Sequence, residues 1–198
     1  MKLIFASNNQ HKTNEIRLLT GKLFEIQTMK EAGIDMDIAE PHDTLEDNAS
    51  EKSKTIFKIT GENCFSEDTG LEVEILNGKP GVRSARYAGE ENSSEKNIDK
   101  LLNELTGVSN RKARFRTIIS LIIEGNELKF EGIIEGTISN EKRGNMNFGY
   151  DPVFVPTGSE RTFGEMEMEE KNKFSHRRKA LEKMLAFLTT SSYINDTK

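Results

Sequence analysis

Residues 65–70 read Phe65-Ser66-Glu67-Asp68-Thr69-Gly70, and this segment decides how the rest of the chain is interpreted. A short apolar run over 63–65 leads into two adjacent carboxylates, a hydroxyl and a glycine. The pattern predicts a strand that ends near Phe65 and opens into a tight loop. In open α/β sheets, ligands bind beyond the carboxyl ends of the strands. We therefore expect an α/β protein with a candidate site at this loop.

Two carboxylates at the end of a strand have a specific chemical use. They suit a hard divalent cation such as Mg²⁺, which keeps several waters and takes few protein ligands. Such a cation can orient a phosphate and a water molecule, while a carboxylate accepts the proton of that water. The alternative interpretation is that Glu67 and Asp68 are solvated turn residues before a flexible glycine.

Composition narrows the class of protein. The 198 residues are 34% hydrophobic and 31% charged, which fits one domain, or two lobes that share a core, and no apolar run is long enough to span a membrane. The apolar run near Met1 is too short for a signal peptide. The single cysteine, Cys64, excludes an internal disulfide, fits the reducing cytoplasm and is expected to be a buried thiol. The net charge of −5 argues against sequence-independent binding of nucleic acid but allows the binding of a small anionic ligand.

The N-terminal segment predicts a strand, a polar loop and a helix. Residues 2–6 are apolar, the stretch from Ser7 to His11 is turn-forming, and a helix is expected from Lys12 onward. The backbone N–H groups at that helix start, together with Lys12, can bind an anion. The alternative is an ordinary strand-to-helix connection with capping side chains.

The remaining apolar patterns predict further helices and strands. Strands are expected at 24–28, 71–75, 113–123 and 128–138, the last two as a hairpin, and helices are expected after Asn48, at 94–105 and after Ser175. In the helix after Asn48, we expect Lys52, Lys54 and Lys58 to point outward. The polar tail, residues 189–198, is expected to fray.

Five polar segments form a set along the chain. They are Ser7-Asn8-Asn9-Gln10-His11-Lys12 with Glu15; Ser66-Glu67-Asp68-Thr69-Gly70-Leu71; Pro80-Gly81-Val82-Arg83-Ser84-Ala85-Arg86-Tyr87-Ala88-Gly89; Phe148-Gly149-Tyr150-Asp151-Pro152; and Glu169-Glu170-Lys171 with Ser175-His176-Arg177. In this order and spacing they resemble the inosine/xanthosine triphosphate pyrophosphatase family, which removes non-standard purine nucleotides. The resemblance runs from Leu3 to about Leu188.

The resemblance implies a fold, an assembly and a reaction. The fold is a single α/β domain over 1–198, with a long twisted mixed sheet and two lobes around a central nucleotide-binding cleft. Members of the family are usually homodimers. Its reaction is the Mg²⁺-dependent hydrolysis of ITP, dITP or XTP to the monophosphate and pyrophosphate. No nucleic-acid or membrane partner is implied.

The resemblance also assigns roles to individual positions. Asp68 would be the general base and a metal ligand, with Glu40 as a second ligand and Glu67 as an optional third. Substrate would be bound by Ser7, Asn8, Asn9, Gln10, His11, Lys12, Lys52, Thr69, Phe148, Gly149, Tyr150, Asp151, Lys171, His176 and Arg177. Phe148 would stack on the base, and Lys171, His176 and Arg177 would meet its edge. Lys171 and Arg177 can only donate hydrogen bonds. They would therefore favour the carbonyl at position six of hypoxanthine or xanthine over the amino group at that position in adenine.

The chain departs from the family pattern at a few positions. Asn8 stands where many members have glycine, His42 where glycine is usual, and Asp47 where glutamate is usual, so a metal role for Asp47 stays open. Two other functions are weighed against the main one: a pyrophosphatase for pyrimidine or modified nucleotides, and a nucleotide sensor that does not hydrolyse. A sensor would not need a general base.

Overall fold

The computed structural model describes residues 1–21, 24–145 and 148–190. The chain forms two compact units, each described by itself. Unit 1 comprises Met1–Asp68, Thr117–Gly132 and the chain from Arg177 onward, and unit 2 comprises Thr69–Arg116 and Ile133–His176. The last helix continues to Thr190. Residues 191–198, most of the predicted frayed tail, lie outside the described residues.

The strands form a mixed sheet, as expected for the predicted α/β class. They pair in the order β2-β1-β3-β5-β6-β7, and β4 pairs with β3 outside this path. β1 is parallel to β2 and β3, whereas β3 and β4, and β6 and β7, are antiparallel. Strands β3, β5 and β6 each contribute residues to both units.

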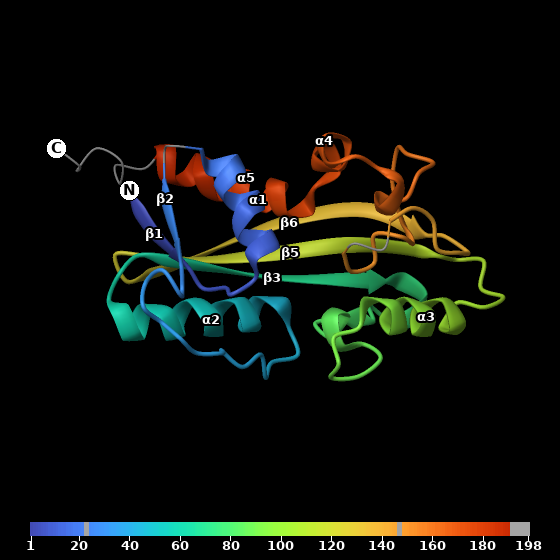
Figure 1. The fold of residues 1–198 in the computed structure, drawn as a ribbon, viewed down its shortest axis with the longest axis horizontal. Coiled ribbons are helices and arrows are strands. Elements are labelled where there is room, and N and C mark those ends of the chain that lie inside the picture. Colours follow the sequence, from blue (N-terminus) through green and yellow to red (C-terminus); the bar gives the residue numbers. More distant parts are fainter. Residues whose placement is uncertain (22–23, 146–147, 191–198) are drawn as a thin grey trace. The chain divides into compact units, whose positions relative to one another are not determined.

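Unit 1 is a layered α/β structure. Its elements are β1 (Lys2–Phe5), α1 (Gln10–Thr20), β2 (Glu25–Thr28), α2 (Leu45–Thr60), the first part of β3 (Cys64–Val73), the second part of β5 (Lys112–Ile123), the first part of β6 (Asn126–Ile138) and α5 (His176–Thr190). Helices α1 and α5 lie on one face of the strands and α2 on the other (Figure 1). Neighbouring strand residues alternate between these layers: Phe5 and Phe65 pack with α1 and α5, whereas Ile4 and Cys64 pack with α2.

The predicted end of the strand at Phe65 is wrong. β3 continues without a break from Cys64 to Val73, so Glu67 and Asp68 lie in the middle of a strand rather than in a loop. Both carboxylates are buried. A buried charge is tolerated only when it is paired, and both are paired by residues from distant parts of the chain, a compensation that the local pattern does not reveal.

The predicted outward orientation of Lys52 is also wrong. Lys54 and Lys58 are exposed, but Lys52 is buried on the inner face of α2 with Ala49 and Ile56. Positions three and four residues apart share one face of a helix, so the spacing of Lys52 from these two apolar residues carries this signal.

Unit 2 contains the remaining elements. They are the end of β3 with η1 (Glu74–Leu76), β4 (Pro80–Gly81), η2 (Ser84–Arg86), α3 (Ser94–Glu104), the start of β5, the end of β6, β7 (Phe154–Pro156), η3 (Phe163–Glu165), α4 (Met168–Lys171) and η4 (Asn172–Phe174). The predicted 94–105 helix and the 113–138 hairpin are confirmed. Leu71, Ile98, Leu101, Phe115 and Phe154 belong to one buried apolar cluster.

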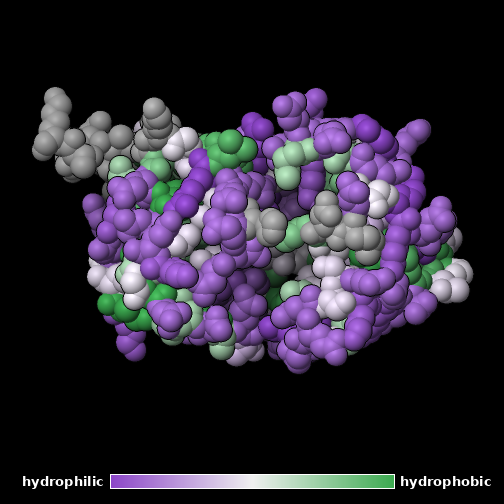
Figure 2. Space-filling view, viewed as in Figure 1, coloured by the Kyte–Doolittle hydropathy of each residue, from purple (hydrophilic) through white to green (hydrophobic). Residues whose placement is uncertain are grey.

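The surface is largely hydrophilic in the view of Figure 2, with hydrophobic residues in small separate groups. Among the described residues, no helix combines the length and the apolar character needed to cross a membrane.

Candidate active site

Two predicted metal ligands of unit 1 converge on one ammonium group. Lys52 Nζ lies 2.7 Å from Glu40 Oε1 and 2.9 Å from Asp68 Oδ1. The side chains of Lys52 and Asp68 are about one-tenth exposed, whereas 31% of the Glu40 side chain is exposed. The group therefore opens to solvent on the Glu40 side.

Three different elements supply this group. Asp68 faces α2 because it has the same strand parity as Cys64, which packs in the α2 layer. Lys52 comes from the inner face of α2, and Glu40 comes from the loop before that helix. Although the Pro41-His42 departure lies beside Glu40, the Glu40 carboxylate still reaches Lys52.

The electrostatics of the group favour a charged lysine and a basic aspartate. Burial alone would lower the pKa of Lys52, but the Asp68 and Glu40 carboxylates outweigh it, so the pKa of the ammonium is raised. Burial raises the pKa of the Asp68 carboxyl; Lys52 opposes this shift and the nearby Glu40 charge supports it. Burial and the Glu40 carboxylate, rather than the adjacent Glu67, therefore raise the pKa of Asp68.

Glu67 belongs to a separate ion network on the other face of the strands. Its Oε1 lies 2.9 Å from Lys12 Nζ, and its Oε2 accepts a 2.6 Å hydrogen bond from Arg177 Nε. Arg177 Nη1 also donates to Glu15 Oε2, at 2.5 Å. α1 contributes Lys12 and Glu15, and α5 contributes Arg177, so the network joins both helices to β3.

This network makes Glu67 a poor metal ligand. Burial would raise the pKa of Glu67, but Arg177 and Lys12 together hold it well below its usual range. The carboxylate is fully buried, and both of its oxygens lie against cationic groups. Since successive strand residues face opposite sides, Glu67 cannot join Glu40 and Asp68 around one cation. The optional third ligand of the sequence analysis is therefore not supported.

The predicted substrate loop leads directly into α1. Ser7 Oγ accepts a hydrogen bond from Asn9 N, and the Asn9 side chain caps α1 by accepting from Lys12 N. Gln10 is already the first residue of the helix, earlier than predicted, and its side chain donates to Asn14. His11 follows in the helix, but its side chain lies outside the described residues.

The departures from the family pattern are accommodated locally. Asn8 is not among the described residues with positive φ, so its position does not require glycine, and its amide donates to Met36 O at 3.3 Å. Asp47 is exposed and accepts a 2.7 Å hydrogen bond from Thr44 Oγ1 at the start of α2. Asp47 thus takes part in capping this helix.

The residues predicted to meet the base lie in unit 2, apart from Arg177. Lys171 Nζ is 2.5 Å from Asp151 Oδ2 and 5.7 Å from the centre of the Phe148 ring, which is 39% exposed. An exposed aromatic face beside a cation is suited to stacking on a nucleobase. Phe148, Asp151 and Lys171 therefore lie together in unit 2.

Other predicted residues of unit 2 are fixed by packing. The His176 ring stacks on Phe115, with centroids 4.9 Å apart and an interplanar angle of 11°. Tyr150 is buried and donates from its hydroxyl to Ser84 O at 2.9 Å. Gly149 has a φ of +50°, which favours glycine. Thr69 is half-buried in β3.

Two residues of unit 1 received no role from the sequence. Glu15 binds Arg177, and its position three residues after Lys12 places both on one face of α1. Asn48 is fully buried and binds the backbone of His42 on both sides, with two 3.0 Å hydrogen bonds. The sequence signal for a role of Asn48 is that this polar residue lies on the inner face of α2, next to Ala49 and one turn before Lys52.

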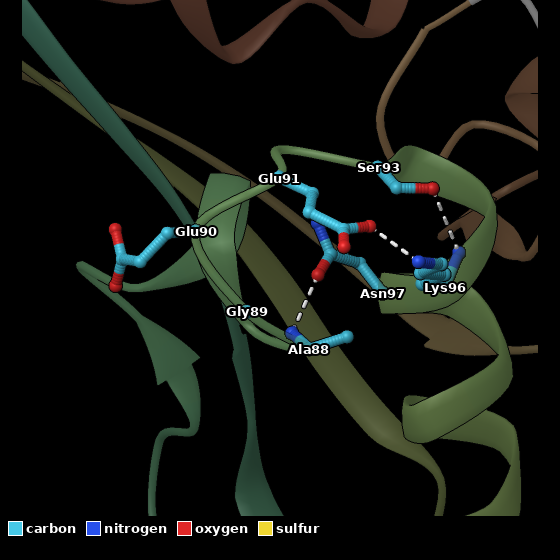
Figure 3. A pocket seen from close by; sticks show the side chains of 7 residues that line it. All are labelled: Ala88, Gly89, Glu90, Glu91, Ser93, Lys96 and Asn97. Carbon is cyan, nitrogen blue, oxygen red and sulfur yellow. Dashed lines mark hydrogen bonds and ion pairs between the residues drawn. The ribbon is translucent and has the colours of Figure 1, made fainter.

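A small pocket of unit 2 lies apart from every predicted site residue. It is lined by Ala88, Gly89, Glu90, Glu91, Ser93, Lys96 and Asn97 (Figure 3). Its polar groups are bonded to one another: Lys96 pairs with Glu91, and Asn97 Oδ1 accepts from Ala88 N. Glu90 points away from these pairs (Figure 3). No substrate role is indicated for this pocket.

The sequence and the fold are similar to those of known proteins. The model of the Ham1 family matches residues 3–187. The chain is 52% identical to a dITP/XTP pyrophosphatase of Porphyromonas gingivalis, covering 94% of this chain and 97% of that protein. It is 46% identical to a dITP/XTP pyrophosphatase of Christiangramia forsetii, covering 96% of this chain and 100% of that protein. A solved Ham1 protein from Coxiella burnetii, 35% identical, matches 96% of this chain and all of that chain with a TM-score of 0.90.

Proposed function

This chain belongs to the Ham1 family, and on that premise we propose that it is a nucleoside triphosphate pyrophosphatase. Its substrates are non-standard purine nucleotides, namely dITP, ITP and XTP, and its products are the monophosphate and pyrophosphate. Its relatives named dITP/XTP pyrophosphatase match along nearly their whole length. The observation that carries the proposal is the convergence of Glu40 and Asp68 on the buried Lys52 ammonium.

The donor set fits a divalent cation. Two carboxylates already lie within 2.9 Å of one positively charged nitrogen, so they tolerate a cation between them. Mg²⁺ takes one or two carboxylates together with water and phosphate oxygens. Glu40 and Asp68 would hold it, and when bound it would neutralise phosphate charge and favour ionisation of water. Since Lys52 is positively charged, it can turn from the carboxylates to the phosphates when a nucleotide is present.

Asp68 is the proposed general base. Its raised pKa makes it a better proton acceptor than an ordinary aspartate. The oxygen of the attacking water bonds to phosphorus while the bond between the α- and β-phosphates breaks, the proton of that water passes to an Asp68 oxygen, and pyrophosphate leaves. Such a transfer depends mostly on positioning and on stabilisation of charge.

The start of α1 is the proposed triphosphate-binding element. The helix N-terminus supplies backbone N–H groups, and Lys12 lies in its first turn. Lys12 is held by Glu67, which fixes the position of the ammonium near that end. We assign Ser7, Asn8, Asn9, Gln10 and His11 to the same element.

The group of Phe148, Asp151 and Lys171 is the proposed base-recognition element, with Gly149 and Tyr150 shaping its loop. Lys171 can donate to a six-carbonyl but not accept from an amino group. Sites built from such donors discriminate strongly, since the wrong substrate leaves a buried donor unpaired. His176 is assigned to the base edge and Thr69 to a contact with the substrate. Arg177 is assigned to the base edge too, although two of its nitrogens are already bound by carboxylates.

The proposal also includes a metal, an assembly and a location. Mg²⁺ is favoured by the oxygen donor set. A homodimer is what the family resemblance implies. A cytoplasmic location fits a chain whose single cysteine, Cys64, is a buried free thiol.

Pyrophosphate release tests the proposal directly. The purified chain is incubated with Mg²⁺ and, separately, with inosine, xanthosine, adenosine, guanosine, cytidine and uridine triphosphates. Fast release from the first two alone supports the proposal. Release from a pyrimidine or from every nucleotide would keep the phosphate chemistry and overturn the base-recognition assignments. Binding without release would favour the sensor.

A further inference from the structure

Asn48 makes a two-point connection between α2 and the loop that carries Glu40. His42 N donates to Asn48 Oδ1, and Asn48 Nδ2 donates to His42 O, each at 3.0 Å. The Asn48 side chain is fully buried. These two hydrogen bonds, termed here the Asn48–His42 pair, hold one loop residue by both of its backbone polar groups.

The constraint on His42 reaches Glu40 through one stiff residue. Pro41 lies between them, and its ring fixes its own φ and restricts the residue before it to extended backbone. The Glu40 side chain is then held at its other end by Lys52, which lies one helical turn after Asn48. The loop is thus attached to the same face of α2 at two adjacent points.

The other metal ligand is tied to the same turn of α2. Ser66 Oγ donates a hydrogen bond to Ala49 O. Ala49 follows Asn48 in α2, and Ser66 lies two residues before Asp68 in β3. Asn48, Ala49 and Lys52 therefore fix the spacing between Glu40 and Asp68.

A role in helix capping does not account for Asn48. The start of α2 is already capped by Thr44, whose side chain accepts from Asp47 N. A buried asparagine can also be present only to satisfy buried backbone groups, and that alternative predicts a loss of stability without a specific loss of metal affinity.

We propose that Asn48 is a positioning residue that holds Glu40 as a metal ligand through the His42 backbone. The inference rests on the proposed metal-dependent function. Residues that orient metal ligands typically contribute about 10–100-fold to metal affinity or activity. Asn48→Asp keeps the size and the acceptor for His42 N but removes the donor to His42 O, so it should loosen the loop.

The experiment measures Mn²⁺ binding to the nucleotide-free chain by electron paramagnetic resonance. We expect Asn48→Asp to raise the Kd for Mn²⁺ by about tenfold or more and to raise the Mg²⁺ concentration needed for half-maximal pyrophosphate release from dITP. In a Glu40→Gln background, the same substitution should have no further effect on Mn²⁺ affinity, since both act through one ligand. Unchanged Mn²⁺ affinity, or an undiminished effect in the Glu40→Gln background, would overturn the inference.

A second pair of variants tests the connection from the loop side, and it decides the question if Asn48→Asp does not fold. His42→Pro removes the backbone N–H that donates a hydrogen bond to Asn48 Oδ1, whereas His42→Ala keeps both the backbone N–H and the backbone C=O. Weaker Mn²⁺ binding in His42→Pro alone supports the inference, and equal binding in the two variants contradicts it. If Asn48→Asp weakens Mn²⁺ binding but the parent chain releases no pyrophosphate, the proposed function fails and the inference stands.

Discussion

Glu67 and Asp68 are neighbours in β3, yet their carboxylates bind different cationic groups on opposite faces of the strand. Glu67 is bound by Lys12 and Arg177 in the layer of α1 and α5, and Asp68 by Lys52 from α2. One carboxylate is therefore committed to holding two helices, and its neighbour is available for chemistry. The following predictions separate these two roles.

Asp68→Asn should abolish pyrophosphate release while leaving the chain folded. The amide cannot accept the proton of the attacking water, and loss of a general base typically costs about 10²–10⁴-fold in rate. Steady-state assays with dITP measure the loss. The matched control is Asp43→Asn on the exposed loop before α2, which should retain activity. Full turnover by Asp68→Asn would refute Asp68 as the base.

Activity should rise with pH. Burial raises the pKa of Asp68, so its protonated form persists at a higher pH than that of an ordinary aspartate. The protonated form cannot act as a base. As pH passes above this raised pKa, the carboxylate becomes available and kcat/KM increases. A profile of kcat/KM from about pH 4, near the ordinary pKa of an aspartate, to pH 10 tests this, and a profile that is flat over the whole range contradicts it.

Lys52→Met should reduce both activity and stability at neutral pH. The substitution leaves Glu40 and Asp68 close together without their shared cation, and like charges repel. The pKa of the Asp68 carboxyl should then rise further, which makes the loss of stability larger at pH 7 than near pH 4. Denaturant unfolding at the two pH values measures it. Lys54→Met, at an exposed position of the same helix, is the control and should change little.

Glu67→Gln should destabilise unit 1 in a pH-dependent manner. Removing one partner from a buried ion pair costs about 3–5 kcal/mol. Because the folded pKa of Glu67 lies below its ordinary value of 4.5, its contribution is complete above that pH and is lost as pH falls below it. The difference in unfolding free energy between parent and variant should therefore shrink below about pH 4.5. A pH-independent difference would argue against this origin, and Glu62→Gln, on an exposed pair with Lys2, serves as the control.

Lys171→Met should weaken base selection more than phosphate chemistry. The variant loses the donor for a six-carbonyl, so kcat/KM for dITP should fall about 10–100-fold, while slow turnover of dATP changes little. The ratio of the two values is the measurement. Lys173→Met, at an exposed position two residues away, should leave the ratio intact. An unchanged ratio in Lys171→Met would remove Lys171 from base recognition.

The parts of the fold that were predictable are those with a strong local period. The apolar face of 94–105 and the hairpin of 113–138 were identified because their side-chain patterns repeat within a single element. The candidate site residues came from motif resemblance; Glu40, Lys52 and Asp68 lie together in the structure, and their roles stay predictions.

The errors have one physical origin. Glu67 and Asp68 looked like loop residues, and Lys52 looked like a solvated lysine, because charges favour water when considered alone. Each charge is neutralised inside the protein by a partner that is not a sequence neighbour. Glu67 pairs with Arg177, 110 residues away, and Asp68 pairs with Lys52, 16 residues away. No local pattern encodes the partners of Glu67 and Asp68, whereas the helical spacing of Lys52 from Ala49 and Ile56 does indicate that Lys52 is buried.

The division of the chain into units has a consequence for engineering and for evolution. Unit 1 is assembled from three stretches of chain that alternate with the two stretches of unit 2. No single cut in the gene yields either unit whole, so neither unit can be exchanged between relatives as one continuous segment.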